Sequence, residues 1–199
     1  MSNKSRSQKL FRILSFMGQL IVKKMNRILI EEVPKGKILD VGGGGEGVIA
    51  QVGRERVTAV DKFQSEINEA KNKAPEATWV LADAKELEYS EEFFDNATSF
   101  FSIMYMSNDD KAEVFKEVNR VLKPNGEFWI WDASISKEEG VFVFKIKAIL
   151  PNKKVVRTAY GVSSKKQTVN DVVDLLESSG FKVEVVEDKK NWYFLKAKK

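Results

Sequence analysis

The chain has 199 residues, with 33 lysines and arginines against 29 aspartates and glutamates, and therefore a formal net charge of +4. It contains no histidine and no cysteine, which excludes disulfides, thiol nucleophiles, cysteine-based metal clusters and imidazole bases. Any chemistry must use carboxylates, lysines, hydroxyls, the backbone or a bound cofactor. The absence of cysteine suits the reducing cytoplasm, where we expect the protein to act.

The charge is unevenly distributed along the chain. Residues 1–37 carry 9 basic and 2 acidic side chains, residues 38–140 carry 11 and 21, and residues 141–199 carry 13 and 6. An acidic centre therefore lies between two basic flanks. This length, with 43% hydrophobic residues, predicts one domain with a core of its own.

Residues 1–36 are expected to form a helical segment. Their apolar side chains recur at helical spacing, and this stripe comprises Leu10, Ile13, Leu14, Met17, Leu20, Ile21, Met25, Ile28 and Leu29. Arg12, Lys23 and Lys24 interrupt it, so neither a secretory signal nor a membrane-spanning helix is expected. We interpret the segment as a lid over the site, with a membrane-surface anchor as the alternative.

From residue 37 the pattern changes to short apolar runs of strand length. These runs are KILDV at 37–41, RVTAVD at 56–61, ATWVLAD at 77–83, NATSFFSI at 96–103 and EFWIWDA at 127–133. Stretches with helical character separate them at 47–52, 64–74 and 109–122. Alternating strands and helices predict an α/β fold with a parallel sheet covered by helices on both faces.

The C-terminal part predicts another connection. VFVFKIKAIL and VVRTAYG, joined by PNKK, predict a hairpin inserted at about 140–162, and a helix is expected over 168–178. The strands expected at 181–188 and 191–198 are separated by too few residues for a crossover, so they must be antiparallel. The main domain is expected to span 37–199.

A glycine-rich loop, DVGGGGEG at 40–47, follows the first of these strands. Glycines let a backbone turn sharply and approach a ligand closely, and free N–H groups at a helix start attract polar or negative groups. Asp61 ends the second strand 19 residues after Gly42, a spacing that suits NAD and other nucleoside cofactors alike.

Further features separate these cofactors. A carboxylate at Asp40 would repel the pyrophosphate of a dinucleotide but attract a cofactor ammonium, and Asp83 places another acid at the end of the third strand. The antiparallel end of the sheet also leaves no residues for a separate substrate domain. A nicotinamide-dependent reductase is therefore disfavoured, and it is kept as an alternative.

At these positions the sequence resembles the class I S-adenosylmethionine-dependent methyltransferases, especially their small-molecule and quinone-type branch. The resemblance rests on ILDVGGGGEG, Asp61, LADAKEL, FDNATSFFSIMY and VLKPNGEFWI, which match the family's motifs in order. It implies a Rossmann-like seven-stranded sheet, mostly parallel with an antiparallel last strand, and S-adenosyl-L-methionine as the cofactor. The resemblance covers residues from about 37 to 199, except for the inserted hairpin.

The resemblance also implies which residues hold the cofactor. The glycine loop would hold its methionine part, Asp61 both ribose hydroxyls, and Asp83 with the N–H of Ala84 the adenine. The full implied set is Asp40, Gly42, Gly43, Gly44, Gly45, Asp61, Lys62, Asp83, Ala84 and Phe100. Phe63 would either cover the adenine or belong to the core.

Two departures from the family pattern concern the loop and the fourth strand. Glu46 stands where many members have a glycine, so the loop path can differ locally. Met104 and Tyr105 stand where relatives often carry a histidine, so deprotonation of the substrate by histidine is not expected.

A general base is optional in the expected reaction, an in-line displacement in which the cofactor brings the reactive group and the protein supplies proximity and orientation. The catalytic residue stays unassigned. Candidates are Tyr105, Asp132, Asp109 and Glu46. Tyr105 is more simply a wall residue, Asp132 a strand end, and Asp109 the N-cap of a helix beginning at 110. No metal motif is found, and no metal site is expected.

Basic residues concentrate outside the cofactor half, and those beyond residue 140 include Lys145, Lys147, Lys153, Lys154, Arg157, Lys165 and Lys166. These residues either form a solvated face or bind an anionic substrate or an acidic membrane surface. We expect a small-molecule acceptor, anionic or aromatic and lipid-like. Nucleic acid is disfavoured because no binding module is recognisable. A nucleic-acid or protein methyltransferase and a non-catalytic S-adenosylmethionine-binding protein stay open as alternatives.

Overall fold

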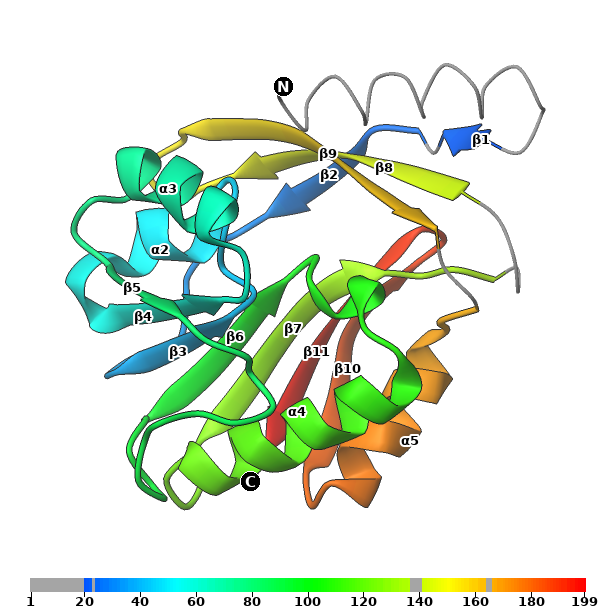
Figure 1. Ribbon diagram of the computed structural model, residues 1–199. Helices are drawn as coiled ribbons and strands as arrows, with labels where there is room; N and C mark the ends of the chain where they lie inside the picture. Colours follow the sequence, from blue (N-terminus) through cyan, green and yellow to red (C-terminus); the bar gives the residue numbers. More distant parts are fainter. Residues whose placement is uncertain (1–19, 23, 137–140, 164–165) are drawn as a thin grey trace.

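Two β-sheets organise the chain, and helices pack around the larger one (Figure 1). The computed structural model describes residues 20–22, 24–136, 141–163 and 166–199. The larger sheet has seven strands in the order β10-β11-β7-β6-β3-β4-β5. The smaller sheet has four strands, β1, β2, β8 and β9.

The elements after residue 37 lie within a few residues of their predicted positions. The strands of the larger sheet are β3 (Ile38–Val41), β4 (Val57–Asp61), β5 (Thr78–Leu81), β6 (Asn96–Phe100), β7 (Glu127–Ala133), β10 (Lys182–Lys189) and β11 (Trp192–Lys198). The helices are α2 (Val48–Gly53), α3 (Gln64–Lys73), α4 (Asn108–Val121) and α5 (Val169–Ser178), with 3₁₀ turns η1 (Arg54–Arg56) and η2 (Ile103–Tyr105).

The larger sheet is parallel except at its C-terminal strand. β11 runs antiparallel to both of its neighbours, β7 and β10, which confirms the predicted seven-stranded arrangement. The strand order reverses at β3, which pairs with β4 on one side and β6 on the other. Open α/β sheets bind ligands at the carboxyl ends of the strands beside such a reversal.

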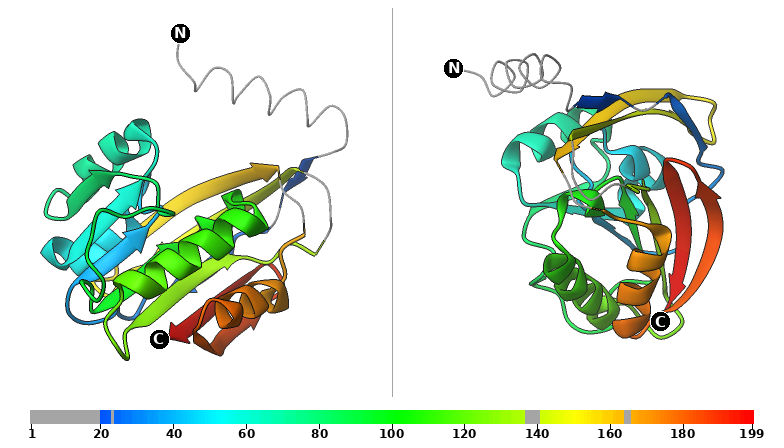
Figure 2. Two further views of the ribbon diagram at one scale, coloured as in Figure 1. Left: turned by 60° about the horizontal axis from the view of Figure 1, so that its bottom comes forward. Right: turned by 90° about the vertical axis from the view of Figure 1, so that its right-hand side faces the viewer.

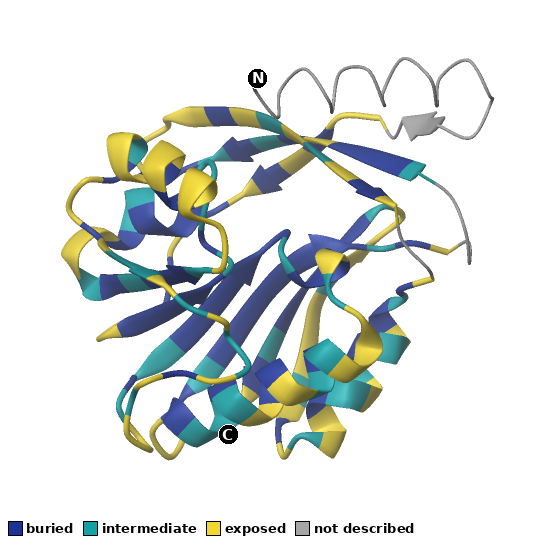
Figure 3. Ribbon diagram, in the orientation of Figure 1, coloured by how far each residue is buried: buried dark blue, intermediate teal, exposed yellow. Residues whose placement is uncertain are grey.

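Each face of the larger sheet is covered by a different kind of layer (Figure 2). On one face the sheet packs against α4 and α5 through the fully buried Phe115, Val118 and Leu176. On the other it packs against α2 and the smaller sheet through Ile49 and Phe144. The central strands are therefore buried on both faces, as Figure 3 shows.

The predicted hairpin is observed as β8 (Val141–Ile149) and β9 (Val155–Ser163), which pair antiparallel. Alternate side chains of β8 face the core, and Phe142, Phe144, Ile146 and Ala148 are at most 1% exposed. The Lys145 side chain between them is exposed. This alternation lets one face of the strand close over the larger sheet, while Lys145 on the other face meets solvent.

The N-terminal segment differs from the expected helices. Leu20–Val22 and Asn26–Leu29 are strands β1 and β2, and both run parallel to β8. Ile28 and Ile30 also have strand spacing, and pairing with the distant β8 selects the strand over the helix. Residues 1–19, and with them most of the predicted lid or anchor, lie outside the described residues. No helix in the described ranges is long and apolar enough to cross a membrane.

The packing of β8 on the larger sheet should contribute to the stability of the fold. Ile146→Ala removes a fully buried side chain and should lower the free energy of unfolding by about 2–5 kcal/mol. Lys145→Ala, one residue away on the exposed side, should change it by less than about 0.5 kcal/mol. Urea unfolding followed by circular dichroism measures both, and equally small effects would contradict this packing.

Candidate functional site

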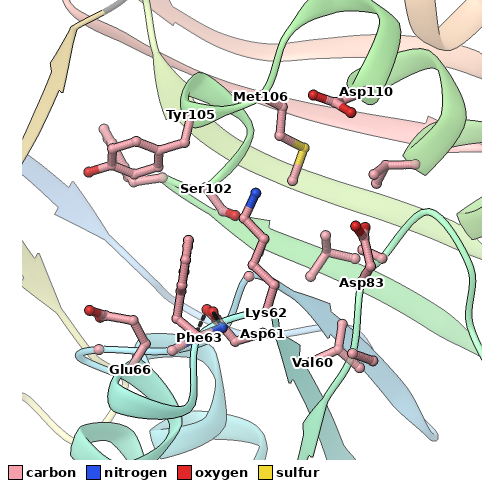
Figure 4. Close-up of a pocket in the computed structure, with 18 of the residues that line it drawn as sticks. Val60, Asp61, Lys62, Phe63, Glu66, Asp83, Ser102, Tyr105, Met106 and Asp110 are labelled. Atoms are coloured by element: carbon pink, nitrogen blue, oxygen red, sulfur yellow. Dashed lines mark hydrogen bonds between the residues drawn. The ribbon is translucent and has the colours of Figure 1, made fainter.

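A cavity of about 400 Å³ opens at the carboxyl ends of β3, β4, β5 and β6, beside the reversal of strand order (Figure 4). The glycine loop, the strand ends, η2 and Tyr160 of β9 line it. Among the residues predicted for the cofactor, the lining includes Gly42, Gly44, Gly45, Asp61, Lys62, Asp83, Ala84 and Phe100. Asp40 and Gly43 do not line it.

The glycine loop lies against the ends of β4 and β6 at distances that only bare backbone permits. A Cβ at Gly42 would lie 1.8 Å from Ser102 Oγ, and one at Gly44 would lie 2.6 Å from Asp61 Oδ2. Gly42 also has a φ of +66°, which side chains disfavour. The loop therefore forms one wall of the cavity with its backbone.

Several N–H groups of the glycine loop form hydrogen bonds within the protein. Gly42 and Gly43 donate to the carbonyl oxygen of Val60 at 2.9 and 3.2 Å. Gly44 donates to Asp61 Oδ2 at 3.2 Å. These bonds fasten the loop to the end of β4.

Asp61 is oriented by two backbone donors. Its Oδ1 accepts from the Phe63 N–H at 2.9 Å and its Oδ2 from Gly44. Each carboxylate oxygen has a second lone pair, so the group can still accept two hydroxyl hydrogens. Phe63 is 55% exposed and lines the cavity, so it does not belong to the core. Figure 4 shows its ring standing beside Asp61 at the cavity.

A second acidic side chain, Asp83, stands at the end of the neighbouring strand. Its Oδ1 accepts from the Lys85 N–H at 3.0 Å, and the Lys85 ammonium pairs with Asp110 at 2.8 Å. Lys85 and a hydrogen bond from Ser107 lower the pKa of Asp110 to about 2. Lys85 therefore forms its ion pair with Asp110, while the Asp83 carboxylate acts on the Lys85 ammonium through its charge without an ion pair between them.

The predicted N-cap of α4 is wrong by two residues. The hydroxyl of Ser107 accepts from the Asp110 N–H at 3.0 Å, and the helix begins at Asn108. Asp109 is exposed in the first turn and does not line the cavity. Serine and aspartate are comparable capping residues, so local sequence alone does not choose between them.

Asp40 lies beneath the loop with 1% of its surface exposed. It accepts from the Thr98 hydroxyl at 2.8 Å, and a Cβ at Gly43 would lie 2.5 Å from its Oδ2. Burial, opposed by the Thr98 bond and aided by the charge of Asp61, raises the pKa of Asp40 to about 7. Asp40 therefore supports the loop from below.

Of the candidates for a general base, Tyr105 lines the cavity, and Asp132 and Glu46 do not. Partial burial and the charges of Asp132 and Glu66 raise the pKa of Tyr105 above its usual value, so its phenol stays protonated at neutral pH. Glu46 pairs with Lys73 at 2.9 Å.

Asp132 is fully buried beneath η2, the turn that carries Tyr105. It accepts from the Ile103 N–H and from the Gln167 side-chain amide, both at 3.0 Å. Burial, opposed by hydrogen bonds and by the Lys111 charge, raises the pKa of Asp132 to about 6. Asp132 thus holds the turn in place without contacting the cavity.

Sequence reasoning missed the aromatic wall opposite the loop. Tyr160 of β9 stacks on Phe101 with ring centroids 5.4 Å apart and planes 6° apart, and both rings line the cavity. Ser102, Met106 and Glu66 were missed as well. The alternation of side chains along the hairpin could have predicted that Tyr160 points inward. It does not predict which part of the protein an inward side chain contacts.

Comparisons with known proteins find similarity to methyltransferases. Residues 39–130 match the family described as "Methyltransferase domain". An uncharacterized methyltransferase of Synechocystis is 28% identical over 75% of this chain and 68% of its own length. A ubiquinone/menaquinone biosynthesis C-methyltransferase of Rickettsia prowazekii is 32% identical over 55% of this chain.

The chain spans 50% of the length of the Rickettsia protein. It spans a smaller share of the length of some other curated relatives that it matches. Among solved structures, an S-adenosylmethionine-dependent methyltransferase from Mesorhizobium loti superposes with a TM-score of 0.60 at 19% identity, covering 84% of this chain and 94% of that one. This likeness shows the fold.

Burial of Asp40 makes the stability of the protein depend on pH. Its pKa rises from the usual 3.8 to about 7, so the folded state binds the proton more tightly than the unfolded state does. The contribution of Asp40 to the free energy of unfolding should therefore decrease as the pH rises from 3.8 to about 7. The total decrease should be on the order of a few kcal/mol.

Asp40→Asn should remove this fall and keep the acceptor for Thr98. Urea unfolding of both proteins at acidic and at mildly alkaline pH measures the difference. Parallel curves for the wild type and the variant would contradict the raised pKa.

Proposed function

We propose that this chain, whose residues 39–130 match the methyltransferase domain family, is an S-adenosylmethionine-dependent methyltransferase that acts on a small molecule. One observation carries the proposal: two carboxylates, Asp61 and Asp83, stand at the ends of adjacent strands and line the same cavity as the glycine backbone. When bound, the cofactor supplies a methyl group on a positively charged sulfur.

The residues present fit this cofactor. Asp61 keeps lone pairs for a pair of hydroxyls, because its two backbone donors use one on each oxygen. Asp83 and the N–H of Ala84 offer an acceptor and a donor for an amino-substituted ring. The backbone from Gly42 to Gly45 packs so closely against its neighbours that side chains there would collide with them, so Gly42, Gly44 and Gly45 line the cavity with backbone alone. A net excess of carboxylates around the cavity favours a cationic ligand over a pyrophosphate.

The opposite wall supports an apolar or aromatic acceptor. Phe63 and Tyr105 are each more than half exposed at the cavity, and Tyr160 and Phe101 form a stacked pair there. Aromatic faces bind planar apolar groups well. A cavity of about 400 Å³, closed on one side by the smaller sheet, has the size of a small-molecule site.

Positioning is the main task of the protein in this proposal. Holding two reactants in alignment supplies several kcal/mol of a displacement barrier without proton transfer. Tyr105, the base candidate that lines the cavity, has a raised pKa and is a poor base at neutral pH. We therefore assign it to the wall, where its ring orients the acceptor.

Binding of the cofactor product, S-adenosylhomocysteine, tests the cofactor half. Asp61→Asn keeps the shape but removes the charge, and should weaken binding by about tenfold or more, because a hydrogen bond to a charged group contributes about 1.5–3 kcal/mol. Titration calorimetry measures it. Asp174→Asn, an exposed acid on α5, is the matched control and should bind as the wild type does.

A wild-type protein that does not bind S-adenosylhomocysteine would refute the proposed function. Binding without turnover of any aromatic or lipid-like acceptor in a panel would leave a non-catalytic cofactor-binding protein.

Once an acceptor that the protein methylates is known, substitutions at Tyr105 test whether this residue is a wall residue or a general base. Tyr105→Phe should leave kcat within about threefold, whereas loss of a general base costs about 10²-fold or more. Tyr105→Ala should raise KM, because the aromatic wall is lost. Steady-state kinetics of both variants decides, and a hundredfold loss of kcat in Tyr105→Phe would make Tyr105 the base.

A further inference from the structure

The smaller sheet has an outer face that takes no part in the cavity. Its strands alternate, so side chains next to the buried ones point away from the core. The outward positions and the hairpin turn carry a group of cations that we call the basic face, comprising Arg27, Lys145, Lys147, Lys153, Lys154 and Arg157. The stretch 141–163 contains no acidic residue.

Three of these cations stand in one row across three strands. Arg27 of β2 pairs in register with Lys147 of β8, and Lys147 pairs with Arg157 of β9. Side chains at directly opposed positions have Cβ atoms about 5 Å apart, and like charges so placed destabilise a sheet. The row therefore carries a repulsion that an anionic partner would relieve.

The basic face lacks acidic partners among the described residues. None of the described ion pairs involves Arg27, Lys147 or Arg157. Glu31 and Glu32 follow β2 but form no ion pair with these cations. The charges are thus available to an external partner. Residues 1–19 carry basic and no acidic side chains, so charge complementarity does not favour them as that partner.

Exposed apolar side chains are interspersed with the cations. Leu29 and Met25 are each 52% exposed, and Val155 is 37% exposed. Leu29 and Val155 flank Ile149 in the row next to the three cations. The outward positions of β2, β8 and β9 hold no aromatic ring on which bases could stack. Cations mixed with aliphatic side chains suit a lipid surface better than a nucleic acid.

We propose that the basic face docks this protein on an anionic lipid surface, independently of the proposed methyl transfer. The acidic segment 38–140 would be repelled by the same surface and would orient the molecule with the smaller sheet toward the lipid. Figure 1 shows this sheet as a layer on one side of the molecule. Its inner side carries Tyr160, so the lipid would lie one sheet away from the cavity wall.

Sedimentation of the full chain with vesicles tests the proposal. The wild type should co-sediment with vesicles of phosphatidylcholine and phosphatidylglycerol, should stay in solution with phosphatidylcholine alone, and should be released by high salt. Arg27→Gln/Lys147→Gln/Arg157→Gln should bind about a hundredfold more weakly, from the contribution of each cation near a charged membrane. Circular dichroism verifies its folding, which the lost repulsion should favour.

The matched control is Lys71→Gln/Lys116→Gln/Lys182→Gln, which removes the same charge from exposed positions on α3, α4 and β10. It should bind vesicles as the wild type does. Leu29→Ser should weaken vesicle binding severalfold, whereas it should not affect binding to the soluble polyanion heparin.

Four outcomes would overturn the proposal. These are no wild-type binding to the anionic vesicles, equal losses in the two triple variants, unchanged binding in the triple variant of the basic face, and binding of a labelled oligonucleotide but not of vesicles. The second would indicate a net-charge effect, the third a site elsewhere in the chain, and the fourth a nucleic-acid surface.

Discussion

The close approach of the glycine loop to the ends of β4 and β6 is the constraint on which the candidate site depends. A Cβ at Gly42 would lie 1.8 Å from the Ser102 hydroxyl oxygen, closer than any nonbonded contact. The loop stays in place because Gly42 and Gly43 donate to the Val60 carbonyl oxygen. The same arrangement presents the Asp61 carboxylate at the cavity, so the glycines decide both the space and the position of the polar group beside it.

Two buried carboxylates support the two segments that shape the cavity. Asp40 lies under the glycine loop and Asp132 lies under η2, and burial raises the pKa values of both, to about 7 and about 6. Neither lines the cavity. Each accepts hydrogen bonds that hold neighbouring elements in register, Asp40 from Thr98 and Asp132 from the Ile103 N–H. Their charge state is therefore coupled to the geometry of the site.

The smaller sheet separates two environments. Its inner face closes the core and contributes Tyr160 to the cavity, while its outer face carries the row of Arg27, Lys147 and Arg157, which form no ion pair within the described part of the chain. The acidic segment 38–140 supplies strands β3 to β7 of the larger sheet together with helices α2, α3 and α4. The modest net charge of +4 thus conceals an acidic cofactor half and a basic outer sheet.

The sequence by itself determined the elements from β3 to β7, the parallel sheet and two of the four cavity-lining acids, because these follow from local periodicity and from residues at strand ends. Asp61 is the last residue of β4, Asp83 comes two residues after β5, and the glycines follow β3. Only the tertiary structure decided that Asn26–Leu29 is a strand, that Tyr160 faces the cavity and that Asp132 lies beneath η2. Each depends on contacts between segments far apart in the chain. Local patterns are ambiguous there, since the apolar spacing of residues 20–30 suits a helix and a strand alike.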